Sequence, residues 1–150
     1  MLYTPLTIKA MRIAYDAHHG QTDKAGAPYI FHPARVSAGF TEEAKACVAW
    51  LHDVIEDTEL SIRDIRREGF GDTVCDALLL LTHDKSVPYM EYVKRIARDP
   101  VARAVKLADL TDNMDISRLS SVTQKDRERL EKYRAAYAYL SKTPAEESVP

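Results

Sequence analysis

Apolar side chains recur along this chain at the three- to four-residue spacing of amphipathic helices, and no stretch alternates with period two for long enough to predict a strand. A threonine cap followed by proline marks a helix start at Thr4-Pro5, and this helix is predicted to stop at Gly20. An irregular loop follows over residues 20–30, which hold two glycines and a proline. The pattern therefore predicts an all-α protein.

Similar start signals divide the rest of the chain. Pro33 should open a short helix, and Thr41 precedes a helix whose long apolar face over residues 44–55 predicts burial, with Trp50 in or near the core. A second buried helix is expected over residues 99–115, with polar groups at its end. Other helices are predicted after Ser61, through residues 74–81, after Pro88, and from Thr123 to about Ser141.

The composition, with 45% apolar and 29% charged residues, is that of a soluble globular protein. At 150 residues the chain fits one domain, which we assign to residues 1–142, with a frayed tail over residues 143–150. No apolar run approaches the ~18 residues needed to cross a bilayer, and residues 1–20 lack the unbroken apolar centre of a signal peptide. We therefore expect a cytoplasmic protein without a membrane partner.

The charge of the chain and its cysteine and histidine residues limit the partners and sites that can be expected. The formal net charge is −2 and both signs are interspersed, so no basic stripe points to nucleic acid as a partner. Cys47 and Cys75 lack the spacing of a thiolate zinc site and should be buried and reduced. His18 and His19 fall at the end of the first helix, where a cationic imidazole would interact favourably with the helix dipole. The oligomeric state stays open.

The dipeptide histidine-aspartate occurs twice, at residues 52–53 and 83–84, and on its own means little. The first copy ends a buried helix and is followed by Glu56 and Asp57. If helical geometry continues, Glu56 lies four residues after the histidine and Asp57 four residues after the aspartate, so each pair shares a face. Three carboxylates would then crowd one apolar helix end, which requires compensating positive charge.

A bound divalent cation would supply that charge directly, because no lysine or arginine stands between Lys45 and Arg63. His32 and Asp109 have similarly apolar neighbours and are the candidates for further ligands. Two histidines and two carboxylates without thiolate suit Mn²⁺, Fe²⁺ or another octahedral ion better than a closed structural zinc site, although Zn²⁺ stays an alternative. The expected ligands are His32, His52, Asp53 and Asp109.

Three motifs, in order, give the chain a family resemblance: AHHGQTDKAGAPYIFHP at residues 17–33, LHDVIEDT at residues 51–58 and VKLADLTDNMD at residues 105–115. The chain resembles the HD-domain hydrolases of the RelA/SpoT type in their short stand-alone form. The resemblance implies a single HD-domain helical bundle and a metal-dependent phosphohydrolase that removes the 3′-pyrophosphate from guanosine alarmones, (p)ppGpp. Relatives in metazoa also act on the 2′-phosphate of NADPH. A nucleotide-binding signalling module that holds a metal but turns over weakly is the alternative from a different class.

The resemblance also assigns roles to individual residues. It matches the four expected ligands to the family's metal site, usually for manganese. It implies that Glu56 and Asp57 form the acidic pair beside the metal-bound water and that Asn113 helps to position the substrate. Lys24 and Tyr29 are candidates for substrate binding, with ordering of their loop as the other interpretation.

The sequence departs from the family pattern at three places. Asp23 stands before Lys24 where alarmone hydrolases commonly carry an arginine that packs against the purine base. Residues 110–113 read Leu-Thr-Asp-Asn where the family usually reads Arg-Leu-His-Asn, and Asp115 and Ile116 replace an arginine and a threonine. These replacements predict less positive charge near the ligand, and therefore weaker binding of a substrate as anionic as ppGpp.

Overall fold

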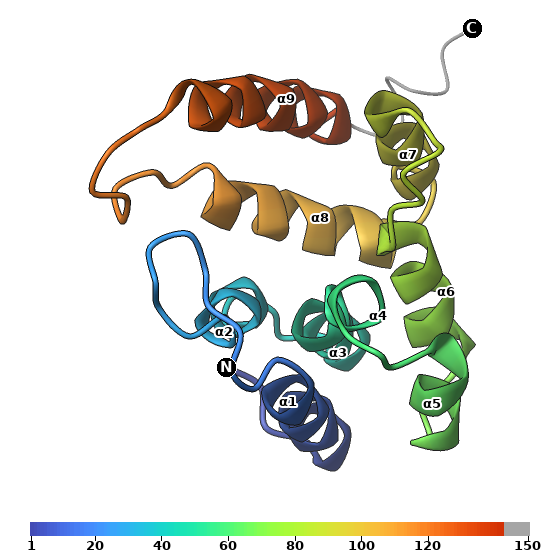
Figure 1. Cartoon of the computed structure of the whole chain (residues 1–150). Helices are drawn as coiled ribbons and strands as arrows, with labels where there is room; N and C mark the ends of the chain where they lie inside the picture. The colour runs from blue at the N-terminus through green and yellow to red at the C-terminus, as the bar shows by residue number, and fades with distance from the viewer. Residues whose placement is uncertain (143–150) are drawn as a thin grey trace, which may run out of the picture.

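The computed structural model describes residues 1–142, and within them it is built from helices (Figure 1). The one extended pairing in this range is an isolated bridge between Thr22 and Pro28. The predicted all-α class is confirmed; the tail predicted for residues 143–150 lies outside the described residues. The helices are α1 (Pro5–Ala17), α2 (Phe31–Ser37), α3 (Glu43–Leu51), α4 (Val54–Asp57), α5 (Ile62–Arg67), α6 (Asp72–Leu81), α7 (Tyr89–Ile96), α8 (Pro100–Asn113) and α9 (Gln124–Leu140).

Three of the predicted helix starts are confirmed by capping boxes. Thr4, Ser61 and Thr123 each accept a hydrogen bond from the backbone N–H three residues later, and the side chain at that position bonds back to the cap. Such a reciprocal pair satisfies two N–H groups that a helix end otherwise leaves unpaired. Pro88 and Pro100 stand at the starts of α7 and α8, as the sequence predicted.

Three helix boundaries differ from the prediction. α2 begins at Phe31, two residues before Pro33, and α3 begins at Glu43 without a capping side chain. The helix expected over residues 44–55 is interrupted, because α3 ends at Leu51 and α4 begins at Val54. In a continuous α-helix neighbouring side chains point roughly 100° apart. The turn at residues 52–53 instead lets two consecutive side chains face one point.

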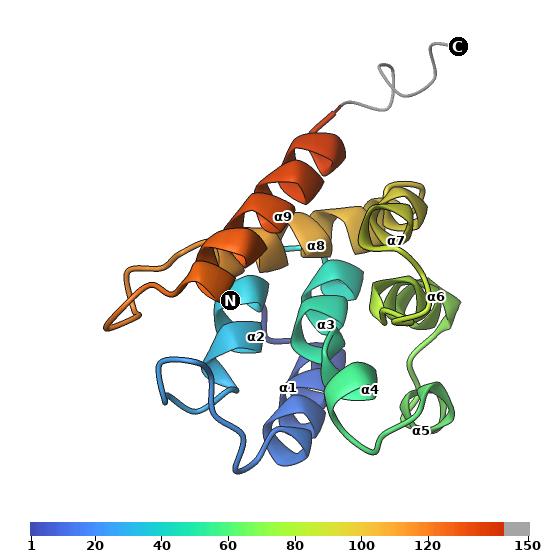
Figure 2. The same cartoon turned by 45° about the horizontal axis from the view of Figure 1, so that its top comes forward.

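The core is organised around α3, which lies between α1, α2, α6 and α8 (Figure 2). Its residues 46–51 are all buried, and Trp50 is 4% exposed, as predicted. Cys47 and Cys75 are buried and not disulfide-bonded, which also agrees with the prediction. Because α3 is held on several sides, the polar turn at its C-terminal end has a fixed position.

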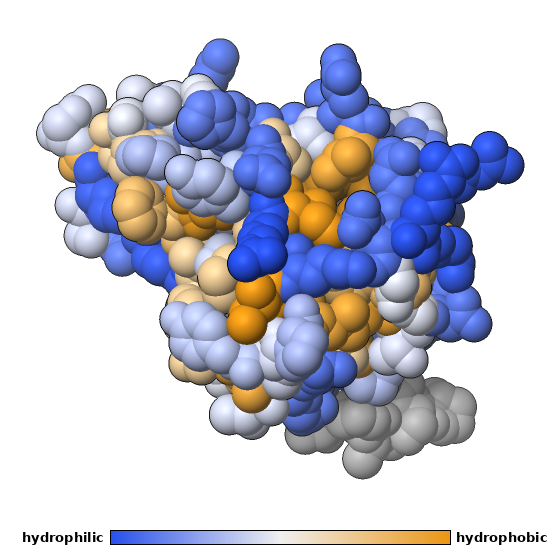
Figure 3. All heavy atoms as spheres, turned by 90° about the horizontal axis from the view of Figure 1, so that it is seen from below, coloured by the Kyte–Doolittle hydropathy of each residue, from blue (hydrophilic) through white to orange (hydrophobic). Residues whose placement is uncertain are grey.

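The outer surface carries both hydrophobic and hydrophilic side chains. On the face seen from below, hydrophobic patches reach the surface between hydrophilic groups (Figure 3), which is usual for a globular protein. Among the described residues, no helix combines the length and the apolar character needed to span a membrane. α9 packs against α7 and α8 and leaves much of its charged surface exposed.

Candidate metal centre and substrate pocket

The four expected ligands meet at one point. α2 supplies His32, the turn after α3 supplies His52 and Asp53, and α8 supplies Asp109. One potential ligand atom from each lies within 4.8 Å of the others. His32 Nε2 lies 2.9 Å from Asp109 Oδ1, and His52 Nε2 lies 3.1 Å from Asp53 Oδ2. Residues far apart in the sequence therefore form one compact donor set.

Both imidazole rings present the same nitrogen to this centre. His52 Nδ1 lies 2.7 Å from the carbonyl oxygen of Ala49, and His32 Nδ1 lies 2.7 Å from Asp112 Oδ2. Since these partners accept hydrogen bonds, each Nδ1 carries a hydrogen, and each Nε2 presents a lone pair to the centre when its ring is neutral. The two Nε2 atoms are only 3.2 Å apart. Two facing lone pairs repel each other, so the donor set fits a cation placed between them.

The charges around the centre support the same conclusion. Burial alone would lower the pKa of His52, but the carboxylates of Asp53 and Asp109 raise it well above its ordinary value. Burial would raise the pKa of Asp109, but Lys106 and His52 hold it well below its usual range. The carboxylates thus stay ionised and draw positive charge to this point, either as protons on the imidazoles or as a metal ion.

Part of the positive charge comes from α8. Lys106 Nζ lies 2.9 Å from Asp109 Oδ2, and the two side chains are only 12% and 6% exposed. Lys106 lies far along the chain from residues 45–63, so the absence of lysine and arginine between Lys45 and Arg63 did not reveal this cation. Because Lys106 occupies Oδ2, the other oxygen of Asp109 is left to face the histidines. Asn113 Nδ2 donates to this Oδ1 at 3.0 Å, so Asn113 contacts a predicted ligand as well as lining the pocket.

The predicted acidic pair borders the centre. Glu56 and Asp57 each bring a carboxylate oxygen within 4.8 Å of one another and of Asp53. The backbone N–H of His83 donates to Glu56 Oε1 at 2.7 Å, which fixes the glutamate. Burial and the charges of Asp53 and Glu56 raise the pKa of Asp57 to about 6. A carboxylate with this pKa can accept and return a proton near neutral pH.

Tyr29 lines the pocket, as expected, and its hydroxyl donates to Asp53 Oδ2. Burial and the Asp53 carboxylate raise the pKa of Tyr29, so the phenol stays protonated and remains a donor. His18 packs behind Tyr29, with ring centroids 4.9 Å apart. Burial lowers the pKa of His18, so the predicted cationic role at the helix end is wrong for this residue. His19 is exposed beside Tyr15.

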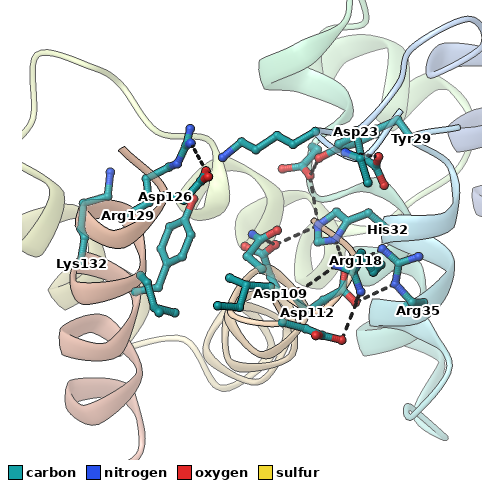
Figure 4. A pocket seen from close by; sticks show the side chains of 18 of the residues that line it. Asp23, Tyr29, His32, Arg35, Asp109, Asp112, Arg118, Asp126, Arg129 and Lys132 are labelled. Carbon is teal, nitrogen blue, oxygen red and sulfur yellow. Dashed lines mark hydrogen bonds and ion pairs between the residues drawn. The ribbon is translucent and has the colours of Figure 1, made fainter. Parts of the chain in front are cut away.

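A pocket of about 470 Å³ opens from the centre and is lined by the loop over residues 20–30, α8, the segment after it, and α9. Lys24 lines it, as expected, and Arg129 and Lys132 line it from α9 (Figure 4). Burial and the charges of Arg129 and Lys132 lower the pKa of Lys24, because these cations lie close together. No local pattern in the sequence marked the two α9 residues, since only the return of the chain over α8 brings them to the pocket.

Two residues at which the chain departs from the family pattern make defined contacts. Asp23 Oδ1 accepts hydrogen bonds from the backbone N–H groups of Ala25 and Ala27, both at 2.9 Å, so this carboxylate shapes its loop. Asp112 pairs with Arg35 at 2.7 Å. The predicted loss of positive charge is therefore incomplete, since Arg35 offsets Asp112 and the α9 cations also line the pocket.

Comparisons with known proteins place the chain. No family model matches it. It is 35% identical over 141 residues to the GTP pyrophosphokinase of Streptomyces coelicolor, an alignment that covers 83% of the chain but 16% of that relative. It is 33% identical over 123 residues to the guanosine-3′,5′-bis(diphosphate) 3′-pyrophosphohydrolase MESH1 of Drosophila melanogaster, covering 74% of the chain and 68% of that relative. The bifunctional (p)ppGpp synthase/hydrolase SpoT of Escherichia coli is 35% identical over 126 residues, covering 71% of the chain and 18% of SpoT.

A solved structure shares the whole fold. It is described as a metazoan orthologue of SpoT that hydrolyses ppGpp, and it matches with a TM-score of 0.76 at 27% identity, covering 93% of this chain and 87% of that one. The chain spans only 16% and 17% of the two Streptomyces relatives, but about two thirds of MESH1. From the shared fold and this coverage, we conclude that the chain belongs to the HD-domain hydrolases of the RelA/SpoT type.

Proposed function

We propose that this protein is a metal-dependent phosphohydrolase that removes the 3′-pyrophosphate of (p)ppGpp. One observation carries the proposal: the compact donor set opens into a pocket that is also lined by Lys24, Arg129 and Lys132. Such a pocket suits a substrate with charged phosphates at more than one end. Support also comes from relatives such as MESH1 and from the metazoan orthologue of SpoT with the matching fold, which are described as hydrolases of this same class of nucleotide.

The metal would be held by the two Nε2 atoms and by one carboxylate oxygen each of Asp53 and Asp109. Two imidazoles and two carboxylates suit Mn²⁺, which we propose, and also accommodate Fe²⁺ or Zn²⁺. When bound, such an ion lowers the pKa of water and polarises a phosphoryl oxygen. Tyr29 donates to Asp53 Oδ2, and Lys106 donates to Asp109 Oδ2. These two contacts orient the carboxylates of Asp53 and Asp109.

Asp57 is the proposed proton acceptor, since it borders Asp53 and has a pKa near neutrality. It would take the proton of the attacking water, while Glu56, held by the His83 backbone, would orient that water. Asn113 lies one turn beyond Asp109 and would contact the substrate from α8. Tyr89 also lines the pocket, and its buried hydroxyl has no hydrogen-bond partner among the described residues.

The test is turnover of ppGpp by protein that has been stripped of metal and then reloaded. We expect release of pyrophosphate only after Mn²⁺ is added, and loss of both bound metal and turnover in Asp109→Asn. Full activity of the stripped protein without any added cation would refute the mechanism. A reloaded protein that binds metal but does not cleave ppGpp would refute the substrate, and failure to cleave NADPH as well would favour the signalling module.

NADPH is a second candidate substrate because of Asp23. Its carboxylate is bonded to loop amides, so the loop offers no guanidinium at this position to stack on a guanine base. A pocket without that contact should discriminate less between purines. The same reloaded protein should therefore be assayed for phosphate release from NADPH, and a higher kcat/KM for NADPH than for ppGpp would reverse the order of the two candidates.

A further inference from the structure

Asp112 lies on α8, one turn after the predicted ligand Asp109. Its side chain contacts the predicted ligand His32 of α2, on the side of the ring that faces away from the centre. Its Oδ2 is 2.7 Å from His32 Nδ1, the ring nitrogen that points away from the centre. The Asp112 side chain is 11% exposed and that of His32 is 5% exposed. This hydrogen bond is therefore largely shielded from water, which makes it stronger than a similar contact at the surface.

The Asp112 carboxylate is itself fixed by a second residue from α2. Arg35, three residues after His32, donates from Nε to Oδ1 at 2.7 Å and from Nη2 to Oδ2 at 3.0 Å. Such a two-point contact sets the plane of the carboxylate as well as its position. Arg118 approaches from the segment after α8, with Nη2 donating to the backbone oxygen of Asp112 at 3.1 Å. Figure 4 shows both guanidinium groups beside Asp112.

The two predicted histidine ligands are consequently held by different kinds of acceptor. His52 donates from Nδ1 to the neutral carbonyl oxygen of Ala49, whereas His32 donates to an ionised carboxylate. A carboxylate acceptor holds the hydrogen on Nδ1 more firmly and makes Nε2 a stronger electron donor to a metal. Where the RelA/SpoT-type pattern has histidine, this chain has Asp112, so the contact rests on one of its departures from the family.

We propose that Asp112, clamped by Arg35, is a positioning residue that fixes the tautomer and orientation of His32 and thereby strengthens metal binding. The inference rests on the metal site of the proposed function. It explains why the arginine and the aspartate occur together: a buried carboxylate against the imidazole needs a partner for its remaining lone pairs, and Arg35 supplies two donors.

The first measurement is Mn²⁺ affinity, obtained by competition with a chelator at fixed pH. Asp112→Ala removes the acceptor and should weaken binding about 10- to 100-fold, the usual effect of losing such a contact behind a metal ligand. Asp112→Asn keeps the size and one acceptor oxygen but loses the charge and half of the clamp, so we expect a smaller loss. Arg35→Met leaves the carboxylate but frees it to rotate, and it should also weaken binding.

Asp115→Asn is the matched control. Asp115 also approaches Arg118, at 3.5 Å, but has no contact with His32. This variant removes one negative charge from the same segment without changing the hydrogen bond, and its Mn²⁺ affinity should match that of the wild type.

The second measurement follows the proton itself, by nitrogen-15 NMR of labelled histidine in protein loaded with diamagnetic Zn²⁺, because paramagnetic Mn²⁺ would broaden the signals of its own ligands. The wild type should show a protonated Nδ1 and a metal-bound Nε2 for His32, and in Asp112→Ala the Nδ1–H signal should broaden or disappear. Unchanged affinity and an unchanged Nδ1–H signal in Asp112→Ala would overturn the inference alone. Equal losses of affinity in Asp112→Asn and Asp115→Asn would overturn it as well, because charge and not the hydrogen bond would then be the cause. A wild type without Mn²⁺ binding would overturn both this inference and the proposed function.

Discussion

Arg129 offers the sharpest test of how the pocket binds phosphate. It lies on α9 and lines the pocket (Figure 4). Arg129→Gln keeps much of the side-chain length and removes the charge. A hydrogen bond to a charged group contributes about 1.5 to 3 kcal/mol. Arg129 already pairs with Asp126 at 2.7 Å and is about one-third exposed, so we take the lower end, about 1.5 kcal/mol, which corresponds to about a tenfold change in affinity.

The assay is steady-state hydrolysis of ppGpp by Mn²⁺-loaded protein. We expect KM to rise about tenfold with little change in kcat, because the contact is made equally in the ground and transition states. The rise should shrink at high salt, which screens a partly exposed charge. Arg127→Gln is the matched control, since Arg127 is exposed on the same helix and does not line the pocket. Equal KM values for the two variants would refute the role of Arg129 in binding.

Three further predictions follow from the centre and its loop. Adding Mn²⁺ at a hundred times its Kd should raise the unfolding midpoint by roughly 5–10 °C in a thermal melt, and Asp109→Asn should abolish that rise. Asp57 acts as a base only when ionised, so kcat should fall as the pH drops through its pKa of about 6. A bound cation should displace this fall to lower pH. Asp57→Asn should lower kcat by about 10² and remove this acidic limb of the pH profile. Asp23→Asn keeps an acceptor for the loop amides and removes a charge, so it should lower KM for ppGpp modestly. Asp23→Arg breaks the hydrogen bonds to the loop amides and should raise KM. A lower KM in Asp23→Arg would contradict this explanation.

The helices could be predicted well because their signals are local. A threonine or serine that caps a helix needs only the next few residues, and the predicted starts at Thr4, Ser61 and Thr123 are confirmed. The burial of Trp50 followed in the same way from the apolar face of its helix. The break at residues 52–53 was missed, because the residues on both sides have helical patterning and the reason for the break lies in the site that they form.

Only part of the candidate site could likewise be predicted from the sequence. The four expected ligands were selected by type and by apolar neighbours, and the structure brings them together, while metal binding itself stays a prediction. The counter-charge of Lys106 and the cations of α9 could not be predicted, because they reach the site through tertiary packing. The hydrogen bonds between Asp23 and the amides of its own loop could not be predicted either, because a count of charges does not reveal hydrogen bonds.

The wide spacing of the predicted ligands along the chain has a consequence for local opening. Residues 32, 52–53 and 109 belong to three separate parts of the sequence, so a bound ion would fasten α2 to α8 across the end of α3. α3 packs against α1 and α6 through apolar side chains that do not include the predicted ligands. Chelation should therefore speed deuterium uptake by the backbone of α2 and the last turn of α8, while α3 stays protected. Loss of metal would then open one corner of the domain long before the helices of the core separate.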